Sequence, residues 1–579
     1  MTDSTLEFPR DAALGRAFRI DTASVWAEAT DHDRLTRIGV GSLIAFQGSK
    51  ASEYLVGMLD RVTRDLQDDV VEDDPLTDEG VPIETRQRDL LRVVLLGTYR
   101  TVEGTRTNTF KRGADSYPLV DSLCWVLEGP NLQKLMGLLS QQLEPEKRLQ
   151  LGTFVADPTA KAVADGDRLF QRHAALLGST GSGKSWSVAL ILERAHALAH
   201  PNLIVFDMHG EYTPLTAGKD PVANGFQIAG PAESTGGDGT LFLPWWLLNQ
   251  EEMQALLLDR SEANAPNQAA RLLHHVRELK HEQLVTEGRD DLAQRFTVDS
   301  PVPFSLDELL ARLEADDNEM VPGATSRDVA GPFKGKLTRF IARLRSRIED
   351  RRYGFMFAPP QSDVGYEWLH ELAKKLLGTS PGIKVIDFSE VPSDVLPVVV
   401  GVLARVLYEI HFWTDADVRT PVTFVCDEAH LYLPASVADP AEQRALESFE
   451  RIAKEGRKYG ISLLVVSQRP SDVSRTVLSQ CNNFIVLRLT NDQDQAVVKR
   501  LMPDSMEGIA AALPLLDVGE ALLLGDAIIL PTRIRLDPPK VKPASATRNF
   551  WTEWNETSVE DSDLVAAVEA MRTQTRSKA

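Results

Sequence analysis

The chain has 579 residues, of which 43% are hydrophobic and 25% are charged, and its formal net charge at pH 7 is −21. This length is enough for about three or four domains, and the composition is that of a globular protein rather than a disordered chain. Such an acidic chain is not expected to coat nucleic acid over its outer surface, although a narrow basic channel inside an acidic shell is compatible with it.

The N-terminus does not resemble a targeting signal. Residues 1–7 have neither a basic region nor an apolar region of the signal-peptide type. No apolar run approaches the ~18 residues that a membrane helix needs. The three cysteines, Cys124, Cys426 and Cys481, exclude a disulfide framework and are not spaced like metal ligands. We therefore expect a cytoplasmic protein without a membrane segment.

The first part of the chain is predicted to be rich in β-strands. The strand candidates are residues 37–46, 53–59, 91–99 and 123–127, separated by turns that contain glycine or proline. Several short strands with long hairpin loops predict a small β-barrel, which we assign to residues 1–155. The acidic residues between 68 and 79 are expected to form a solvated loop, with a partner-docking or DNA-excluding surface as the alternative.

A phosphate-binding loop follows. Residues 173–177 form a short apolar run of the buried-strand type, and residues 186–193 have helical character. Between them lies a sequence that fits G-x-x-x-x-G-K-[ST], namely Gly178, Ser179, Thr180, Gly181, Ser182, Gly183, Lys184 and Ser185. Such glycines let successive backbone N–H groups turn toward phosphate oxygens, and the helix N-terminus adds its dipole. We expect ATP here, with Lys184 on the β- and γ-phosphates, Ser185 on Mg²⁺ and Trp186 beside the nucleotide.

Strands and helices alternate from about residue 155, which predicts a parallel α/β sheet. Its strand candidates are residues 173–177, 203–207, 383–387, 422–427, 461–467 and 484–489. We assign this core to residues 156–244 and 376–540. Asp207 and Glu211 follow one of these strands, at the sheet edge where open α/β sheets bind ligands. We expect them to couple to the nucleotide or to contact DNA, with a structural turn as the alternative.

The strand pattern disappears between residues 245 and 375. Residues 251–258, 269–279 and 336–348 have helical spacing, so we predict a helical insertion within the α/β core. Arg343, Arg345 and Arg347 are spread over two faces of the last helix, which favours a solvated helix over a DNA-contacting stripe.

The second half of an ATPase site is predicted after the insertion. Residues 422–427 form a hydrophobic strand that ends in Asp427 and Glu428, the pattern called Walker B. Asp427 is expected to hold Mg²⁺, and Glu428 to orient and deprotonate the attacking water.

Two further kinds of catalytic residue are expected near this site. Gln468 stands at the end of the next strand, where it could contact the γ-phosphate or the water. An arginine finger supplied by a neighbouring subunit would stabilise charge on the transferred phosphoryl group. Arg457 is the first candidate, and Arg172 and Arg451 are the alternatives. Beyond Pro538 and Pro539, residues 541–579 are predicted to form an extended arm that ends in a short helix.

Together these motifs resemble the HerA family of hexameric DNA translocases. The residues that carry the resemblance run from Arg172 to Ser185, then 207–212, 427–430, 456–460, 467–470 and 478–482. The resemblance implies a RecA-like P-loop ATPase core, an N-terminal HAS-type barrel and a C-terminal brace across the neighbouring subunit. It also implies a homo-hexameric ring that hydrolyses ATP with Mg²⁺ and moves duplex DNA through its channel. Met208 departs from the proline that is common at this position.

The resemblance further implies an effector partner. In relatives the partner is a NurA-like nuclease that works in DNA end resection, or, in anti-phage defence, a sirtuin-like NAD hydrolase or another nuclease. The sequence leaves repair and defence both open. It also leaves open an ATP-gated scaffold that switches an effector with little translocation. A protein-unfolding ATPase is disfavoured, because residues 520–530 are of β-type and not a helical lid.

Overall fold

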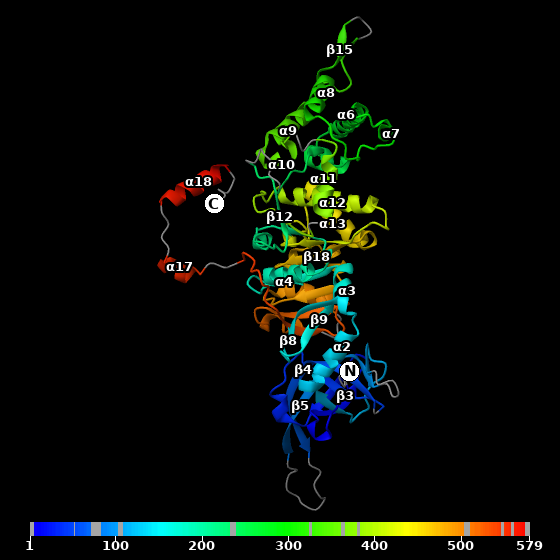
Figure 1. Ribbon diagram of the computed structural model, residues 1–579, viewed down its shortest axis with the longest axis vertical. Helices are drawn as coiled ribbons and strands as arrows, with labels where there is room; N and C mark the ends of the chain where they lie inside the picture. The colour runs from blue at the N-terminus through cyan, green and yellow to red at the C-terminus, as the bar shows by residue number, and fades with distance from the viewer. Residues whose placement is uncertain are drawn as a thin grey trace, which may run out of the picture. The chain divides into compact units, whose positions relative to one another are not determined.

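Figure 1 shows the computed structural model of the chain. The chain folds into two compact units. The first contains residues 1–194, 467–471 and 481–540, and the second contains residues 195–466, 472–480 and 541–579. The structure describes residues 5–50, 52–70, 83–101, 108–231, 239–322, 327–360, 365–378, 382–502, 510–545, 549–556 and 561–573.

The first unit begins with a closed β-barrel. Its strands are β1 (Gly15–Ile20), β2 (Ser24–Ala29), β3 (Leu43–Gln47), β4 (Glu53–Val70), β5 (Ile83–Thr101), β6 (Asn108–Arg112) and β7 (Leu123–Val126), with the short helix α1 (His32–Leu35) between β2 and β3. They pair in the order β2-β1-β7-β3-β4-β5-β6, and an additional β2–β5 pairing closes the barrel. The predicted N-terminal barrel is therefore confirmed. The strand expected over residues 37–46 starts only at Leu43, because Gly41 has a φ of 96° and turns the chain.

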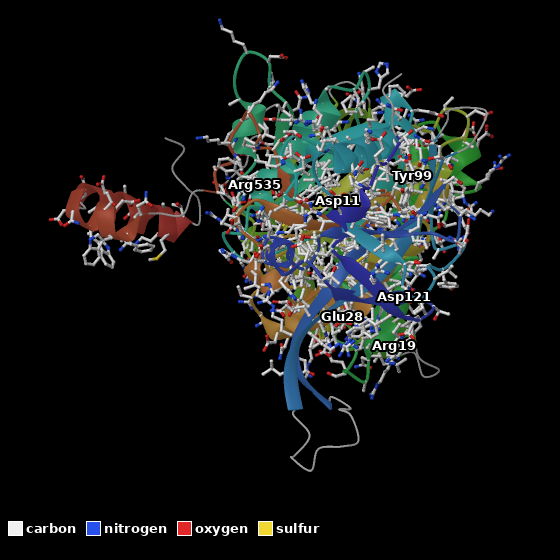
Figure 2. All side chains as sticks on the ribbon, turned by 90° about the horizontal axis from the view of Figure 1, so that it is seen from below. Asp11, Arg19, Glu28, Tyr99, Asp121 and Arg535 are labelled. Carbon is white, nitrogen blue, oxygen red and sulfur yellow. The ribbon has the colours of Figure 1, made fainter. Side chains whose placement is uncertain are left out.

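The barrel is filled with apolar side chains and tied together by polar ones at its wall. Val25, Ile44 and Phe46 are fully buried in its core. Glu28 of β2, labelled in Figure 2, forms an ion pair of 2.9 Å with Arg88 of β5 across the closing strand pair. The acidic stretch expected as a loop is partly strand, since residues 68–70 belong to β4, while residues 71–82 lie outside the described residues.

A second sheet of the first unit follows the barrel. It runs in the order β10 (Ala174–Leu177), β19 (Asn483–Val486), β20 (Glu520–Gly525), β21 (Thr532–Leu536), β8 (Arg148–Phe154) and β9 (Lys161–Asp165). Only the β10–β19 pair of this group is parallel. The accompanying helices are α2 (Gly129–Gln141), α3 (Gly166–Gln171), α4 (Lys184–His196) and α15 (Asp492–Leu501), and the last two residues of α4 belong to the second unit.

The second unit is built on a parallel sheet. Its order is β13 (Thr240–Leu241), β12 (Asn224–Ile228), β16 (Ile383–Asp387), β11 (Leu203–Asp207), β17 (Val422–Cys426) and β18 (Ile461–Ser467). Strands β11 and β17 are buried along their whole length, as expected for strands covered on both faces. Helices α12 (Leu396–Trp413), α13 (Pro440–Glu455) and α14 (Arg475–Gln480) accompany the sheet.

Helix α12 is long and apolar enough to cross a membrane by length and composition, but 78% of it is buried inside the protein. It packs closely on α13: a Cβ added at Gly401 would lie 2.4 Å from the Cβ of Ala445. This burial is that of a core helix.

The predicted helical insertion is present in the second unit. It contains α5 (Gln250–Leu257), α6 (Ala265–Thr286), α7 (Asp290–Ala293), α8 (Leu306–Asn318), α9 (Thr338–Glu349), α10 (Gly354–Phe357) and α11 (Trp368–Leu377), with a small hairpin of β14 (Met320–Pro322) and β15 (Asp328–Ala330). Arg343 and Arg345 of α9 pair with Glu262 and Glu314. The arm carries α17 (Phe550–Glu556) and α18 (Asp561–Thr573), so the α/β fold class with its barrel, insertion and arm is confirmed.

Candidate functional site

The phosphate-binding loop has the backbone that its sequence predicts. It connects β10 to α4 in the first unit, and Gly181 and Gly183 have φ values of 72° and 105°. Residues other than glycine rarely adopt this left-handed backbone conformation. A Cβ at Gly178 would lie 2.6 Å from Ser182 Oγ and 2.7 Å from the Cβ of Leu487, so this position also requires glycine.

The loop residues fit the phosphates of a nucleotide. Ser182 Oγ is buried and has no hydrogen-bond partner within the described part of the chain. Lys184, with 9% exposure, is the first residue of the 13-residue helix α4 and stands at its positive end. Ser185 is half-buried, and Trp186 is 38% exposed. An unsatisfied hydroxyl, a buried ammonium group and a helix N-terminus together favour a polyphosphate.

The structure brings Gln468 to this loop. Thr180 Oγ1 donates a hydrogen bond of 2.6 Å to Gln468 Oε1, and the Gly178 N–H donates to the carbonyl oxygen of Ser467 at 3.2 Å. The amide of Gln468 is thereby held beside the residues that would surround the terminal phosphate. The sensor role of Gln468 stays a prediction.

A group of carboxylates lies in the second unit. Asp207 is the last residue of β11 and pairs in register with Asp387, the last residue of β16. Asp427 directly follows β17, which pairs with β11 on its other side. Because the carboxyl ends of parallel strands meet at one edge of a sheet, these three acids gather there.

This edge carries concentrated negative charge. Burial raises the pKa of Asp427 well above its usual range, and the nearby Glu428, Asp207 and Glu211 raise it further. The pKa of Asp207 is raised to about 6, mainly because the carboxyl is buried. Repulsion from Asp387 also raises this pKa, whereas backbone hydrogen bonds from Tyr212 and Glu211 lower it. Buried carboxylates that repel one another fit a hard divalent cation, which Mg²⁺ provides.

Asp207 also shapes its own loop. Its carboxylate accepts backbone hydrogen bonds from His209 at 3.3 Å, Glu211 at 3.0 Å and Tyr212 at 2.8 Å. The structural turn that the sequence left open is therefore present. The predicted coupling of Asp207 and Glu211 to nucleotide or DNA stays a prediction.

Glu428 is held in an unusual backbone conformation. Its φ is 42° and its ψ is 46°, in the left-handed region that residues other than glycine rarely occupy. Its side chain is mostly buried, and Oε2 lies 3.3 Å from Nδ1 of His430. Strained residues of this kind cluster at functional sites.

Three residues near this acidic edge received no specific role from the sequence. Asp387, His430 and Tyr212 take part in its charge network, and the Tyr212 hydroxyl is buried with no hydrogen-bond partner among the described residues. Asp387 is the last residue of a strand that the hydrophobic pattern predicted. Its position at a strand end could have identified it as a candidate site residue. Nothing in the spacing of the other two indicated their contacts.

The three arginine-finger candidates differ in their surroundings. Arg172 forms an ion pair with Asp526. Arg451 lies over the ring of Tyr408 at 5.1 Å and 3.6 Å from Glu455. Arg457 is exposed, and its side chain makes no ion pair with any residue that the structure describes. A finger must be available to a neighbouring subunit, so Arg457 stays the first candidate.

Comparisons with known proteins point to one family. Residues 149–407 match the family described as "Helicase HerA, central domain". The DNA double-strand break repair helicase HerA of Sulfolobus acidocaldarius is 27% identical over 395 residues, 67% of this chain and 70% of that protein. The Pyrococcus furiosus protein of the same name is 27% identical over 456 residues, 72% of this chain and 74% of its own.

A similarity to a solved structure is weaker. The bacterial conjugative coupling protein TrwB has a TM-score of 0.45 at 14% identity, over 71% of this chain and 93% of that structure. The matched family range ends before Asp427, so the family match covers the phosphate-binding loop and Asp207 but not the Walker B carboxylates.

Proposed function

We propose that this chain, which belongs to the HerA family and is an ATP hydrolase of the helicase type, uses ATP to move duplex DNA. The observation that carries the proposal is the glycine-built loop with the buried Lys184 at the start of α4 and Gln468 bonded to it. The relatives named as DNA repair helicases support DNA as the substrate.

The phosphate-binding loop would hold the substrate. Backbone N–H groups of residues 179–185 would bind the phosphate oxygens, and the Lys184 ammonium would neutralise charge at the β- and γ-phosphates. Gln468 would exchange its bond to Thr180 for one to the γ-phosphate or to the attacking water. The segment from β10 through the loop to α4 positions the loop N–H groups and Lys184, and Gln468 is placed by the end of β18.

The acidic edge of the second unit would supply the base. Glu428 would take a proton from the attacking water, and His430, 3.3 Å from its carboxylate, would keep that carboxylate oriented. Ser185 and Asp427 would hold Mg²⁺, which when bound supplies positive charge to the phosphate oxygens. Arg457 of another copy would stabilise the charge that develops on the transferred group.

The assembly and partners follow from the family as further parts of the proposal. We expect a homo-hexamer in the cytoplasm with DNA in its channel, and an effector that is a NurA-like nuclease, a sirtuin-like NAD hydrolase or another nuclease. Either DNA end processing or anti-phage defence would use such a motor.

A pair of variants tests this function. Lys184→Ala should abolish nucleotide binding, while Glu428→Gln should bind ATP but hydrolyse it at least 100-fold more slowly. ATPase rate, nucleotide affinity and DNA translocation are measured on the same preparations, with His196→Gln, at an exposed position of α4, as a surface control. Full hydrolysis by Lys184→Ala would refute the assignment. Translocation lost in Glu428→Gln with the partner still fully activated would favour an ATP-gated scaffold over a motor.

A further inference from the structure

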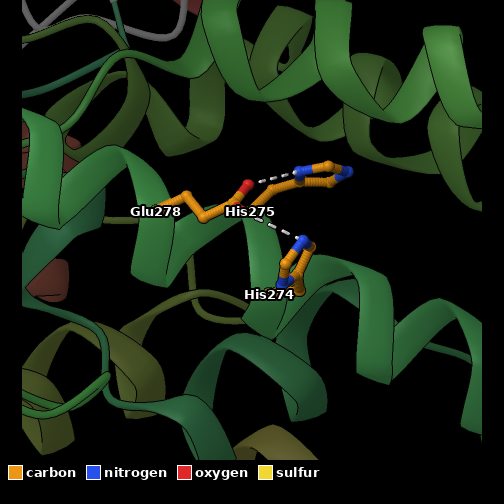
Figure 3. A group of neighbouring side chains, drawn as sticks. All are labelled: His274, His275 and Glu278. Atoms are coloured by element: carbon orange, nitrogen blue, oxygen red, sulfur yellow. Dashed lines mark ion pairs between the residues drawn. The ribbon is translucent and has the colours of Figure 1, made fainter.

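A second group of ligand-type side chains lies on α6, in the helical insertion of the second unit. His274, His275 and Glu278 are on adjacent turns of this helix, and their donor atoms all lie within 4.8 Å of one another (Figure 3). Glu278 points between the two imidazoles: Oε1 lies 3.2 Å from His274 Nε2, and Oε2 lies 3.6 Å from His275 Nδ1. The nucleotide residues described above are not part of this group.

His275 is the member that makes the group more than an exposed charge cluster. It is only 5% exposed, and its Nδ1 is buried with no hydrogen-bond partner among the described residues. Its other nitrogen, Nε2, lies 2.7 Å from Asp316 Oδ2 on α8. Because a carboxylate only accepts, this short contact puts the proton on Nε2 and leaves a lone pair on Nδ1. Arg271 Nη2 lies 3.1 Å from the same Nε2, and Arg271 Nε pairs with Asp316 Oδ2 at 2.5 Å.

The lone pair of Nδ1 therefore faces a carboxylate that is also only an acceptor. Oε2 of that carboxylate also lies 3.6 Å from Nη1 of Arg312. A cation between Nδ1 and Glu278 would satisfy the imidazole and would share the carboxylate with Arg312. In a tetrahedral zinc site with bonds of about 2.0–2.1 Å, neighbouring ligand atoms are roughly 3.4 Å apart. The separations of 3.2 and 3.6 Å, each to a different oxygen of Glu278, are close to this edge length. One donor atom from each residue lies within 4.8 Å of the others, so the side chains would have to close in by about an ångström around an ion.

The surrounding shell has the form that metal-bound histidines use. Metal-ligating imidazoles usually donate their second N–H to a carboxylate, which fixes the ring and its tautomer. Asp316 stands in that position for His275. Two imidazoles and one carboxylate suit a borderline divalent ion of the first transition row, and they leave a fourth position for water.

We propose that His274, His275 and Glu278 bind one Zn²⁺ ion, with Asp316 orienting His275. Because Asp316 belongs to α8 and already bonds His275, an ion that fixes the His275 ring would strengthen this existing contact between α6 and α8. Because all three ligands come from one helix and one side of the site is exposed, the bound ion would exchange with free Zn²⁺ in solution, as a regulatory ion does. This site is independent of the proposed ATP chemistry.

The experiment uses the full chain without an affinity tag, dialysed against a chelator and titrated with Zn²⁺ against a chromophoric competitor in nucleotide-free buffer. The wild type should bind one Zn²⁺ per chain at this site. His274→Ala and Glu278→Gln should weaken this binding at least 10-fold, and Asp316→Asn roughly 10-fold as a positioning residue. His281→Ala, an exposed histidine of the same helix, is the matched control and should bind as the wild type does.

Two readouts separate the outcomes. Zn²⁺ should slow hydrogen exchange in both α6 and α8 of the wild type, and it should not do so in His274→Ala. Asp427→Ala, which lacks the carboxylate proposed to hold Mg²⁺ at the ATP site, should respond to Zn²⁺ as the wild type does. Circular dichroism confirms that each variant is folded. Equal zinc affinity in the wild type and His274→Ala would overturn the proposal. So would a wild type that takes up no zinc.

Discussion

Arg405 of α12 provides a sharp test of what stabilises the second unit. It is 8% exposed and bonds Glu252 of α5 through two contacts of 2.6 and 2.8 Å. It also donates to the Leu247 carbonyl oxygen at 2.6 Å and to Glu409 at 2.8 Å. Replacing it with methionine keeps most of the volume but removes the positive charge from two carboxylates. Glu252 is 9% exposed, and burial already raises the pKa of Glu409.

We expect Arg405→Met to destabilise the second unit by about 3–5 kcal/mol, the cost of leaving a buried ion pair without one partner. Arg444→Met is the control: Arg444 pairs with Glu251 and Glu447, whose side chains are 56% and 44% exposed. Exposed pairs of this kind contribute about 0–1 kcal/mol. The double variant Arg405→Met/Glu252→Gln should lose less than the single one, because the amide keeps the cap of α5 without a buried charge.

Urea unfolding followed by hydrogen exchange of α5 and α12 measures these differences locally, because a two-unit protein need not unfold in one step. Equal losses in Arg405→Met and Arg444→Met would refute the reasoning. A double variant less stable than the single one would show that the desolvated carboxylate is not the cause.

Two other predictions concern packing and pH. Gly401→Ala should destabilise the α12–α13 contact by about 1–3 kcal/mol, because the new methyl would lie 2.4 Å from the Cβ of Ala445. Gly137→Ala is the control: a Cβ there would meet no neighbouring atom within 4 Å, so this variant should be neutral or stabilising. Thermal unfolding measures both. Burial lowers the pKa of Lys280 to about 7, so between pH 7 and 10.5 the unfolded chain binds a proton that the folded chain does not. Stability should therefore rise with pH in this window, by at most about 1.4 kcal/mol per pH unit, and Lys280→Met should show a smaller slope in urea titrations from pH 7 to 9.5. An unchanged slope would contradict the burial argument.

The amino-acid sequence by itself determined much of the local structure of this protein. Local rules were enough for the phosphate-binding loop: positive φ at Gly181 and Gly183 is a property of glycine in that motif, and the flanking strand and helix follow from hydrophobic pattern. Strands β11 and β17 were equally visible as apolar runs that end in acids. The position of Asp427 and Glu428 at the end of β17 could therefore be predicted without a structure, and their Walker B role stays a prediction.

Tertiary structure decided the contacts between segments far apart in the chain. The bond from Thr180 to Gln468 joins residues 288 positions apart, and the in-register pairing of Asp207 with Asp387 depends on strand order. The placement of Asp316 against His275 likewise depends on how α8 packs on α6. Backbone preference and hydrophobic period act over a few residues, so they fix loops, strands and helices. Strand order and helix packing depend on burial summed over the whole unit, which no local pattern contains.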